Sequence, residues 1–323
     1  MFAHRIVTFD GPDGLVWTEV EEPAADSGVV VDVAAAGVSY ADLLQTTGAY
    51  QLKVPLPFTP GMEAAGVVRS APAGAGFAVG QRVAVLTSYG CWQEVVRAPA
   101  ERVLPLPEDM SFEAGAAAPL NHLTGLLALV RRGRAHAGET LLVHGAAGGV
   151  GTAVVQLGRA LGLRTVAVVG DEAKKDFARQ SGAHHAVLSA GWLGAVRELL
   201  GERAVDIVVD PVGGDRMTDS LRSLAPEGRV LVLGFAAGEI PTVKVNRLLL
   251  GNTGVLGVAS REYFEQRPET IADLWARLIE LRRDKELPDP RVRSYPFPDA
   301  RDALRAMAGR QALGKIVLSR RRA

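Results

Sequence analysis

The 323-residue chain contains a single cysteine, Cys91. One cysteine cannot form an intrachain disulfide, and it cannot supply a zinc or iron–sulfur site that needs several thiolates. A lone thiol is typical of a reducing compartment, so the sequence predicts a cytoplasmic location. Cys91 lies beside Trp92, and we interpret it as a small packed residue.

The sequence also lacks an excess of either charge, and it contains no long apolar run. Lysine plus arginine and aspartate plus glutamate each number 36, so the formal net charge is +0. A neutral chain has no basic field to attract nucleic acid or an anionic membrane surface. No apolar run approaches the roughly 18 residues that span a bilayer, and the first residues do not resemble a signal peptide. We therefore expect no nucleic acid and no membrane as partner.

The length is sufficient for two domains at about 150 residues each, with one large barrel as the alternative. Residues 1–118 contain short β-type runs separated by glycine and proline, for example at 28–33, 66–68 and 82–85. Such short strands between turn residues predict a β-rich, barrel-like unit.

Strands and helices alternate from about residue 120 to residue 258. We predict strands at 140–144, 164–169, 205–209, 229–233 and 254–258, and helices at 149–162, 172–181 and 214–224. Repeated β–α–β units with strands rich in Val, Ile and Leu predict an α/β fold with a doubly wound parallel sheet of the Rossmann type.

After residue 258 the chain again resembles residues 1–118 in character. We predict a helix at 271–283 and a closing strand at 315–318. This order predicts a Rossmann domain, residues 121–259, inserted into a β-rich domain. The β-rich domain would consist of residues 1–120 and 260–323.

The glycine-rich segment Gly145–Gly151 is the sharpest motif. It follows a predicted strand and opens a helix with an apolar face. Glycines let the backbone approach a pyrophosphate, and the free N–H groups and dipole of the helix start face the anion. A tight turn without a ligand is the alternative, but the required strand and helix flank the motif. We predict a dinucleotide site formed by Gly145, Ala146, Ala147, Gly148, Gly149 and Val150.

The end of the second strand decides between NAD and NADP. An NAD enzyme usually presents a carboxylate there, and Asp171 lies near the expected spacing. The strand is expected to end at Val169, however, which leaves Asp171 as a helix N-cap. Lys174 could reach a 2′-phosphate, although a solvated helix lysine is the alternative. We predict NADPH, with Gly170 and Lys174 among its contacts.

Two further segments, Gly37–Leu43 (Gly-Val-Ser-Tyr-Ala-Asp-Leu) and Pro60–Val68 (Pro-Gly-Met-Glu-Ala-Ala-Gly-Val-Val), accompany the glycine loop. With the closing Gly314–Leu318, they resemble the medium-chain dehydrogenase/reductase superfamily over essentially the whole chain. The nearest resemblance is to its quinone oxidoreductase (zeta-crystallin-like) branch. The resemblance implies that the β-rich domain is GroES-like.

The zinc alcohol dehydrogenases of that superfamily are the main alternative. The resemblance places Ser39, Met62 and, approximately, Leu120 at the positions of their catalytic zinc ligands, and none is a good ligand. We therefore predict no metal, and we interpret Glu63 as structural. Without a Lewis acid, alcohol oxidation is implausible. Hydride delivery to an electron-poor acceptor needs only orientation, modest polarisation and a proton.

In the quinone oxidoreductase branch the acceptor lies over the nicotinamide, in the cleft between domains, among tyrosines of the first domain. Tyr50 matches one of these positions and Tyr40 lies nearby in the sequence, so a phenol could hydrogen-bond the acceptor or relay a proton. Aromatic residues packed in a loop are the alternative. Ser39 replaces an asparagine that is common in the branch. We predict Tyr50, Tyr40 and Ser39 as the catalytic residues.

Other cofactor contacts are implied by position. They are Asn121 and Thr124 at the entry to the second domain, Val212 within Asp210–Gly213, Gly234 and Phe235 after the next strand, and Arg310 in the tail. The six histidines form no metal-spaced cluster, and we interpret them as structural or surface residues.

The sequence therefore predicts a zinc-independent NADPH:quinone oxidoreductase that reduces a small-molecule quinone or enone. The branch suggests a homodimer. One alternative is an enoyl-thioester or alkenal reductase of the same fold, for which a long acyl channel or basic groups for a CoA phosphate would argue. Another is a non-catalytic, crystallin-like protein that binds NADPH. The neutral charge argues against an RNA-contacting role for such a protein.

Overall fold

The computed structural model describes the chain except for residues 25–27, 285–286 and 321–323. The chain divides into two compact units. Unit 1 comprises Met1–Leu120, Arg267–Trp275 and Asp289–Ala323, and unit 2 comprises Asn121–Gln266 and Ala276–Pro288. None of the described helices is long and apolar enough to cross a membrane.

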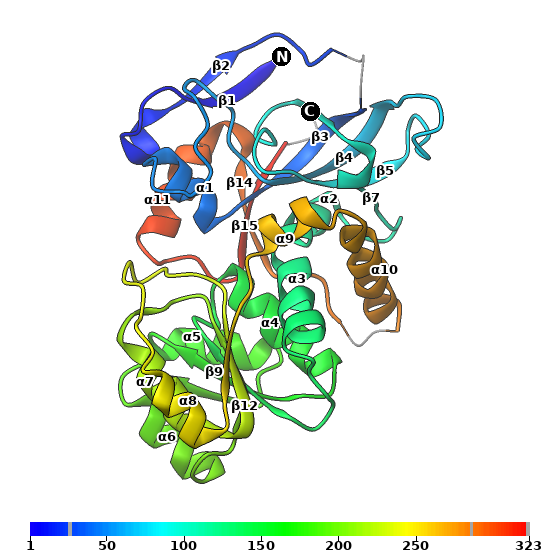
Figure 1. Ribbon diagram of the computed structural model, residues 1–323. Coiled ribbons are helices and arrows are strands. Elements are labelled where there is room, and N and C mark those ends of the chain that lie inside the picture. Colours follow the sequence, from blue (N-terminus) through cyan, green and yellow to red (C-terminus); the bar gives the residue numbers. More distant parts are fainter. Residues whose placement is uncertain (25–27, 285–286, 321–323) are drawn as a thin grey trace. The chain divides into compact units, whose positions relative to one another are not determined.

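Unit 2 contains one six-stranded parallel sheet (Figure 1), with the strand order β10-β9-β8-β11-β12-β13. The strands are β8 (Thr140–His144), β9 (Arg164–Val169), β10 (His185–Leu188), β11 (Val205–Asp210), β12 (Leu224–Val232) and β13 (Gly254–Gly257). This order starts near the middle and winds outward in both directions, which confirms the predicted Rossmann-type sheet.

Helices of unit 2 cover both faces of this sheet. The helices of this unit are α3 (Pro119–Leu126, which begins in unit 1), α4 (Gly149–Ala160), α5 (Glu172–Gln180), α6 (Trp192–Leu200), α7 (Met217–Ser223), α8 (Val245–Gly251) and α9 (Ser260–Gln266). On β8, Leu141 abuts Gly158 of α4, whereas His144 contacts Trp192 of α6 and Ser220 of α7. Leu141 and His144 are three residues apart, so they point to opposite faces of the strand.

One predicted helix of unit 2 differs in detail. The segment expected to be helical at 214–224 starts as a 3-10 turn, Gly214–Arg216, before α7. Gly213 and Gly214 have φ values of 67° and 75°, which glycine adopts readily and other residues rarely do. The chain therefore turns sharply before the helix begins.

Unit 1 is built on a mixed sheet in which β3 (Val29–Val38) is central. The strand order is β14-β15-β3-β4-β5-β7, and β6 also pairs with β3. The remaining strands are β4 (Glu63–Ser70), β5 (Arg82–Leu86), β6 (Val95–Ala98), β7 (Val103–Pro105), β14 (Val292–Pro296) and β15 (Lys315–Ser319), with β1 (Phe2–Ile6) and β2 (Leu15–Glu19) in a separate two-stranded sheet.

The helices that accompany these strands are α1 (Tyr40–Thr46), α2 (Phe112–Ala117), α10 (Glu269–Arg283) and α11 (Ala300–Ala308). We expected residues 260–323 to lie wholly in the β-rich domain. Residues 260–266 and 276–288 instead group with unit 2. Within unit 2, Thr124 Oγ1 of α3 donates a hydrogen bond of 3.0 Å to Oγ of Ser260, the first residue of α9.

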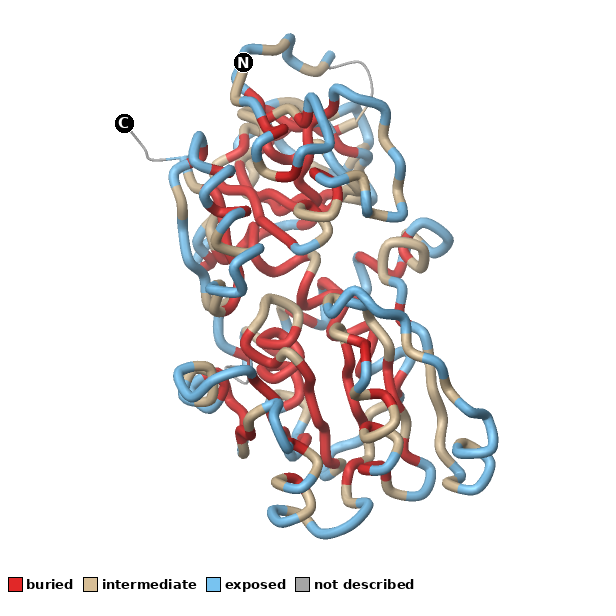
Figure 2. Tube along the Cα trace, turned by 90° about the vertical axis from the view of Figure 1, so that its left-hand side faces the viewer, coloured by how far each residue is buried: buried red, intermediate tan, exposed pale blue. Residues whose placement is uncertain are grey.

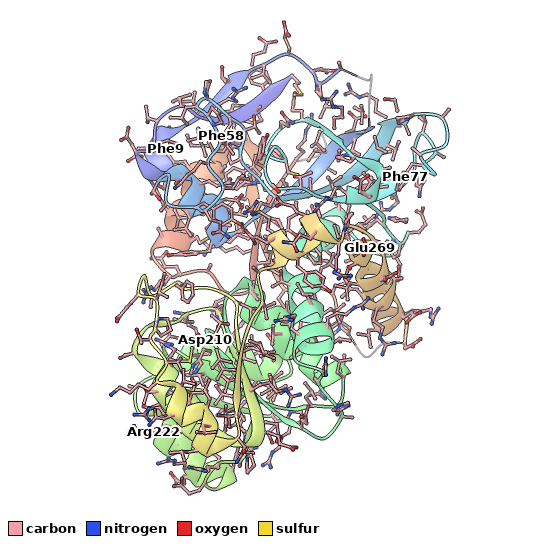
Figure 3. The ribbon with its side chains drawn as sticks, in the orientation of Figure 1. Phe9, Phe58, Phe77, Asp210, Arg222 and Glu269 are labelled. Carbon is pink, nitrogen blue, oxygen red and sulfur yellow. The ribbon has the colours of Figure 1, made fainter. Side chains whose placement is uncertain are left out.

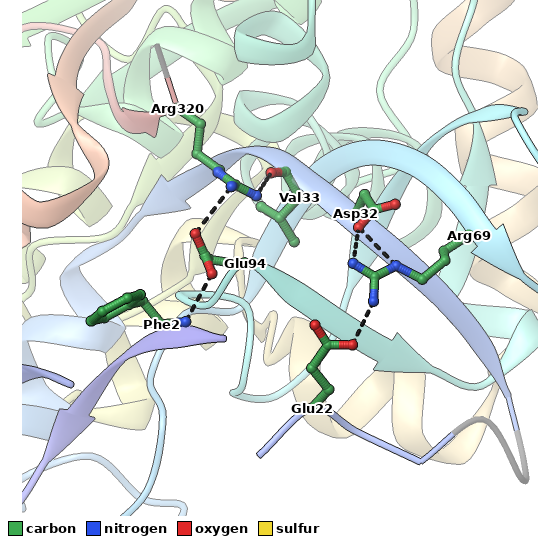
Figure 4. Close-up of polar contacts among 7 residues, drawn as sticks. All are labelled: Phe2, Glu22, Asp32, Val33, Arg69, Glu94 and Arg320. Atoms are coloured by element: carbon green, nitrogen blue, oxygen red, sulfur yellow. Dashed lines mark hydrogen bonds and ion pairs between the residues drawn. The ribbon is translucent and has the colours of Figure 1, made fainter. Parts of the chain in front are cut away.

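Buried residues, red in Figure 2, form the core of each unit. At the surface of unit 1, hydrogen bonds and ion pairs join segments that are far apart in the sequence (Figure 4). The Glu94 carboxylate accepts hydrogen bonds from Phe2 N at 2.8 Å and from an Arg320 Nη at 3.0 Å. A second network joins Arg69 to Asp32 and Glu22.

Candidate functional site

The glycine loop between β8 and α4 is held in a shape that only small residues permit. Gly145 has a φ of 60°. A Cβ on Gly151 would lie 2.2 Å from the carbonyl oxygen of Gly145, so the loop packs on its own backbone. Gly148 is the N-cap of α4 and supplies no side-chain capping bond. The first N–H groups of a helix have no intrahelical acceptor, so this helix start can receive an anion.

Space remains open in front of this loop at one position. A Cβ on Gly148 would meet only the carbonyl oxygen of Gly145, at 3.4 Å, which is ordinary contact. A Cβ on Gly149 would instead lie 2.6 Å from Nδ2 of Asn121. The structure therefore brings the predicted contact Asn121 against the predicted loop.

The segment after β11 also packs against the glycine loop. A Cβ on Gly145 would lie 3.0 Å from Cγ2 of Val212. Oδ1 of Asp210 accepts hydrogen bonds from Val212 N at 2.8 Å and from Gly213 N at 3.0 Å. Strands β8 and β11 are neighbours at the point where the strand order reverses, which is where dinucleotides bind in such sheets.

The segment after β12 joins the same group. A Cβ on Gly213 would lie 2.9 Å from Cδ1 of Phe235, and one on Gly234 would lie 3.4 Å from the Pro211 carbonyl oxygen. The backbone N–H of Ala236 donates to that same Pro211 oxygen at 3.2 Å. The predicted contacts Val212, Gly234 and Phe235 thus meet at the carboxyl ends of adjacent strands.

Asp210 is fully buried at the end of β11 (Figure 3). Burial raises the pKa of its carboxyl, and the bonds from Gly213 and Val212 act in the opposite direction. Its Oδ2 atom makes no hydrogen bond within the described part of the chain. Sequence analysis pointed to the segment Asp210–Gly213 but did not identify Asp210 as the residue that shapes it.

At the end of β9, Asp171 caps α5. Its Oδ1 accepts a hydrogen bond from Lys174 N at 2.9 Å, and its Oδ2 lies 2.9 Å from Lys174 Nζ. The hydrogen bond with the Lys174 side chain lowers the pKa of Asp171. Strand β9 ends at Val169, as expected, so the N-cap interpretation of Asp171 is confirmed. Gly170 is exposed, and a Cβ there would meet nothing within 4 Å.

The predicted catalytic residues belong to unit 1. Ser39 is the N-cap of α1, and its hydroxyl donates to Asp42 Oδ2 at 2.6 Å. Tyr40 is the first residue of α1 and is 44% exposed. Tyr50 follows the helix, and its backbone N–H donates to the Leu44 carbonyl oxygen at 3.2 Å. The hydroxyl proton of Ser39 is therefore directed inward, whereas the Tyr40 side chain reaches solvent.

Comparison with known proteins agrees with this architecture. Residues 149–279 match the zinc-binding dehydrogenase family, and residues 25–108 match the alcohol dehydrogenase GroES-like domain family. Quinone oxidoreductase-like protein 2 of Rattus norvegicus is 35% identical over 301 residues, covering 92% of this chain and 86% of the relative. The chain belongs to the medium-chain dehydrogenase/reductase superfamily, in its quinone oxidoreductase-like branch.

Two solved structures share the whole fold. A probable oxidoreductase from Mycobacterium abscessus is 41% identical with a TM-score of 0.90, and the match covers 99% of this chain and 98% of that one. The quinone oxidoreductase from Thermus thermophilus, which was also solved as a complex with NADPH, is 34% identical with a TM-score of 0.81. That match covers 99% of this chain and 100% of the other.

The three residues that we expected at the positions of catalytic zinc ligands, of which Leu120 is only an approximate match, have other uses in the chain. Ser39 caps α1, Met62 is 3% exposed, and Leu120 donates its N–H to Glu63 Oε2 at 2.7 Å. The described residues include no group of three or more His, Cys, Asp or Glu that could hold a metal ion. The absence of a metal remains a prediction. Glu63 is buried and paired with Lys315, in agreement with a structural role.

Two buried histidines are engaged in packing. His4 Nε2 lies 2.8 Å from the Phe297 carbonyl oxygen, and burial lowers the pKa of His4 to about 4. His144 Nε2 lies 3.0 Å from Ser220 Oγ, and burial lowers its pKa to about 3. Cys91 is fully buried, which confirms that it is packed.

Thr124 and Arg310 are two further predicted cofactor contacts. Thr124 Oγ1 donates a hydrogen bond to Ser260 Oγ. Arg310 lies in unit 1, is exposed and has a φ of 55°, an unusual conformation for a residue other than glycine. Their roles at the cofactor remain predictions.

Proposed function

We propose that the chain is a zinc-independent, NADPH-dependent reductase of quinones or other electron-poor conjugated carbonyl compounds. The observation that carries this proposal is the open start of α4 at Gly148, which has no side-chain cap, with Asn121 packed against Gly149 and Val212 against Gly145. Family membership supports the reaction class. The Thermus relative, whose structure includes an NADPH complex, supports the cofactor.

The residues present fit a dinucleotide. The N–H groups at the start of α4 would hold the pyrophosphate, and the side chains of Asn121 and Val212 border the same loop. Gly145, Ala146, Ala147, Gly149, Val150, Gly170, Gly234, Phe235, Thr124 and Arg310 complete the proposed contacts. NADPH, when bound, supplies the hydride.

Lys174 favours the phosphorylated cofactor. Its ammonium is partly exposed and is held in the first turn of α5 by Asp171. The 2′-phosphate of NADPH is a stronger anion than one carboxylate, and it would accept hydrogen bonds from the same ammonium. Asp171 is already used as an N-cap, so it is poorly placed to serve as the ribose-binding carboxylate of an NAD enzyme.

Tyr40 and Tyr50 are the proposed groups for the acceptor oxygen. A phenol can donate a hydrogen bond to a carbonyl and pass a proton as that oxygen becomes basic. We assign Ser39 a different part, because its hydroxyl donates to Asp42. Ser39 would orient the start of α1, and therefore Tyr40, without giving up its proton.

The test mixes the protein with NADPH or NADH and a simple ortho-quinone and follows absorbance of the reduced cofactor. We expect rapid oxidation of NADPH and slower oxidation of NADH. Gly148→Val serves as the matched variant without cofactor binding. Turnover that survives in Gly148→Val, or a wild type that oxidises neither cofactor with any quinone or enone, would contradict the proposal.

We also propose a homodimer. Helix α8 exposes Val245, Leu249 and Leu250 at 73%, 75% and 77%, and Ile240 nearby is 70% exposed. Apolar groups gathered in this way mark interaction surfaces. The following strand, β13, is the outer strand of the sheet in the described part of the chain, and a two-fold copy of itself would satisfy that edge.

Light scattering on the eluting protein tests this arrangement. The wild type should have twice the mass of the chain, and Leu249→Glu/Leu250→Glu should elute as a monomer. Glu198→Gln, on α6, provides a control that leaves α8 unchanged. A monomeric wild type, or binding of this surface to lipid vesicles instead, would contradict the dimer.

A further inference from the structure

A buried carboxylate joins two strands of unit 1 to the start of a helix. Glu63, the first residue of β4, is 1% exposed. Its Oε1 contacts Nζ of Lys315, the first residue of β15, which is 3% exposed. Its Oε2 accepts a hydrogen bond from the backbone N–H of Leu120 at 2.7 Å. Both oxygens of Glu63 are therefore used inside the protein.

The N–H of Leu120 lies in the first turn of α3. Leu120 is the second residue of α3, and the first, Pro119, has no N–H. The N–H groups in the first turn of a helix have no acceptor within the helix, and a carboxylate also interacts favourably with the positive end of the helix dipole. Glu63, which precedes Leu120 by 57 residues, thus caps α3.

Gly37 makes this contact sterically possible. A Cβ at position 37 would lie 2.5 Å from both Cγ and Oε1 of Glu63. Gly37 needs no unusual backbone conformation, so the requirement is for space. Any larger residue would push the Glu63 side chain away from Leu120. Gly37 and Glu63 come from the two segments of unit 1 on which the family resemblance rests.

We propose that Glu63 is a positioning residue that caps α3 through Leu120 and thereby fixes where Asn121 begins the dinucleotide-binding unit. Asn121 follows Leu120 directly, and its side chain lies against Gly149 of the glycine loop. Lys315 neutralises the buried carboxylate, since an unpaired charge at this depth would be strongly unfavourable. A glutamate in a segment associated with zinc in related enzymes thus has a use that requires no metal.

Two double variants separate the hydrogen bond from the charges. Glu63→Gln/Lys315→Met removes both charges but keeps an amide oxygen that can accept from Leu120. Glu63→Met/Lys315→Met removes the charges and the acceptor. Neither leaves Glu63 or Lys315 as a buried charge without its partner. The two charges act in opposite directions on the buried Asp42, so their joint removal largely cancels there, and both variants are expected to fold. The control is Glu113→Met, which removes another carboxylate of unit 1, bonded to Ser319 Oγ at 2.6 Å.

The first measurement is amide hydrogen exchange of Leu120. In the wild type, Leu120 should exchange far more slowly than an unbonded helix-start amide. Exchange should be about five- to tenfold faster in the Met/Met variant than in the Gln/Met variant, the change that a neutral hydrogen bond provides. Glu113→Met should leave it unchanged. Fast exchange of Leu120 in the wild type, or equal rates in the two double variants, would overturn the cap.

The second measurement is the dissociation constant for NADPH, which rests on the proposed function. The Met/Met variant should bind NADPH several-fold more weakly than the Gln/Met variant, because Asn121 is no longer held. Equal affinities despite different Leu120 exchange would overturn the positioning role. If the wild type binds no NADPH, the proposed function fails and the positioning role fails with it, while the exchange rates still decide whether Glu63 caps α3.

Discussion

Asp171 and Lys174 make two contacts with each other in the first turn of α5. The carboxylate accepts from the Lys174 backbone N–H at 2.9 Å, and it pairs with the Lys174 ammonium at 2.9 Å. The first contact stabilises the helix, and the second holds a cation in the first turn of α5, which follows β9 and the exposed Gly170. These two functions of one carboxylate can be separated by substitution.

Lys174→Ala should weaken NADPH binding about tenfold and leave NADH binding almost unchanged. A hydrogen bond to a charged group contributes roughly 1.5–3 kcal/mol, and a partly exposed lysine belongs at the low end. Asp171→Asn keeps a good N-cap while removing the charge that competes with the phosphate, so it should improve NADPH binding or leave it unchanged. Calorimetry with both cofactors measures these effects. A selective loss of NADH in Asp171→Asn would show that Asp171 is a ribose-binding acid.

Gly148→Val should abolish NADPH binding with little effect on folding. The Gly148 backbone is extended, with a φ of −82°, and a Cβ there meets only ordinary contact. The added side chain would occupy the space in front of the helix start. Thermal unfolding and calorimetry check the two halves of this expectation.

Gly151→Ala provides the contrast, because its Cβ would lie 2.2 Å from the Gly145 carbonyl oxygen. This variant should lower the melting temperature as well as the affinity. Equal NADPH affinity in Gly148→Val and the wild type would show that the pyrophosphate lies elsewhere.

Chelation should not affect activity. The family resemblance places Ser39, Met62 and, approximately, Leu120 at the positions of the zinc ligands, and none of them is a good ligand. We expect elemental analysis of the purified protein to find no stoichiometric zinc, and turnover to be unchanged after dialysis against a chelator. One zinc per chain, lost together with activity, would refute this expectation.

The sequence predicted the parts of the fold that depend on neighbouring residues. Strands β8 and β9 have the expected bounds because each contains a run of buried apolar residues, Leu141–Val143 and Val166–Val169, and each ends just before a glycine. Strand β10 was missed because it is four residues long and begins with a histidine. Helix α8 was missed because its three consecutive leucines, Leu248–Leu250, show no helical spacing of apolar and polar residues.

In the candidate site, too, the features that depend on neighbouring residues were predicted, and most of the others were not. The glycine loop and the cap at Asp171 could be predicted, since each depends on residues within one turn of the chain. The bond between Glu63 and Leu120 could not, because it joins residues 57 positions apart. The inward direction of the Ser39 hydroxyl was also missed, although Asp42 lies only three residues away and this spacing is that of a capping box, which could have indicated it.

His144 should make the folded state sensitive to acid. Burial lowers its pKa in the folded protein to about 3, whereas an unfolded histidine titrates near 6.5. Above pH 6.5 the ring is neutral in both states, and the folded protein has its full stability. As the pH falls below 6.5, only the unfolded chain takes up the proton, so the free energy of unfolding decreases. Between pH 6.5 and 4.5, His144 should reduce the free energy of unfolding by about 1.4 kcal/mol per pH unit.

His144→Gln isolates this effect. Glutamine does not titrate, so the variant should be less stable than the wild type at pH 7.5 but should lose stability more gradually on acidification. His4, whose pKa is lowered to about 4, has the same sign and is present in both proteins, so its contribution cancels in the difference. Denaturant unfolding at several pH values gives the two slopes. Parallel slopes would mean that His144 takes up its proton over the same pH range in the folded protein as in the unfolded chain, and that burial against Trp192 and Ser220 does not hold it neutral.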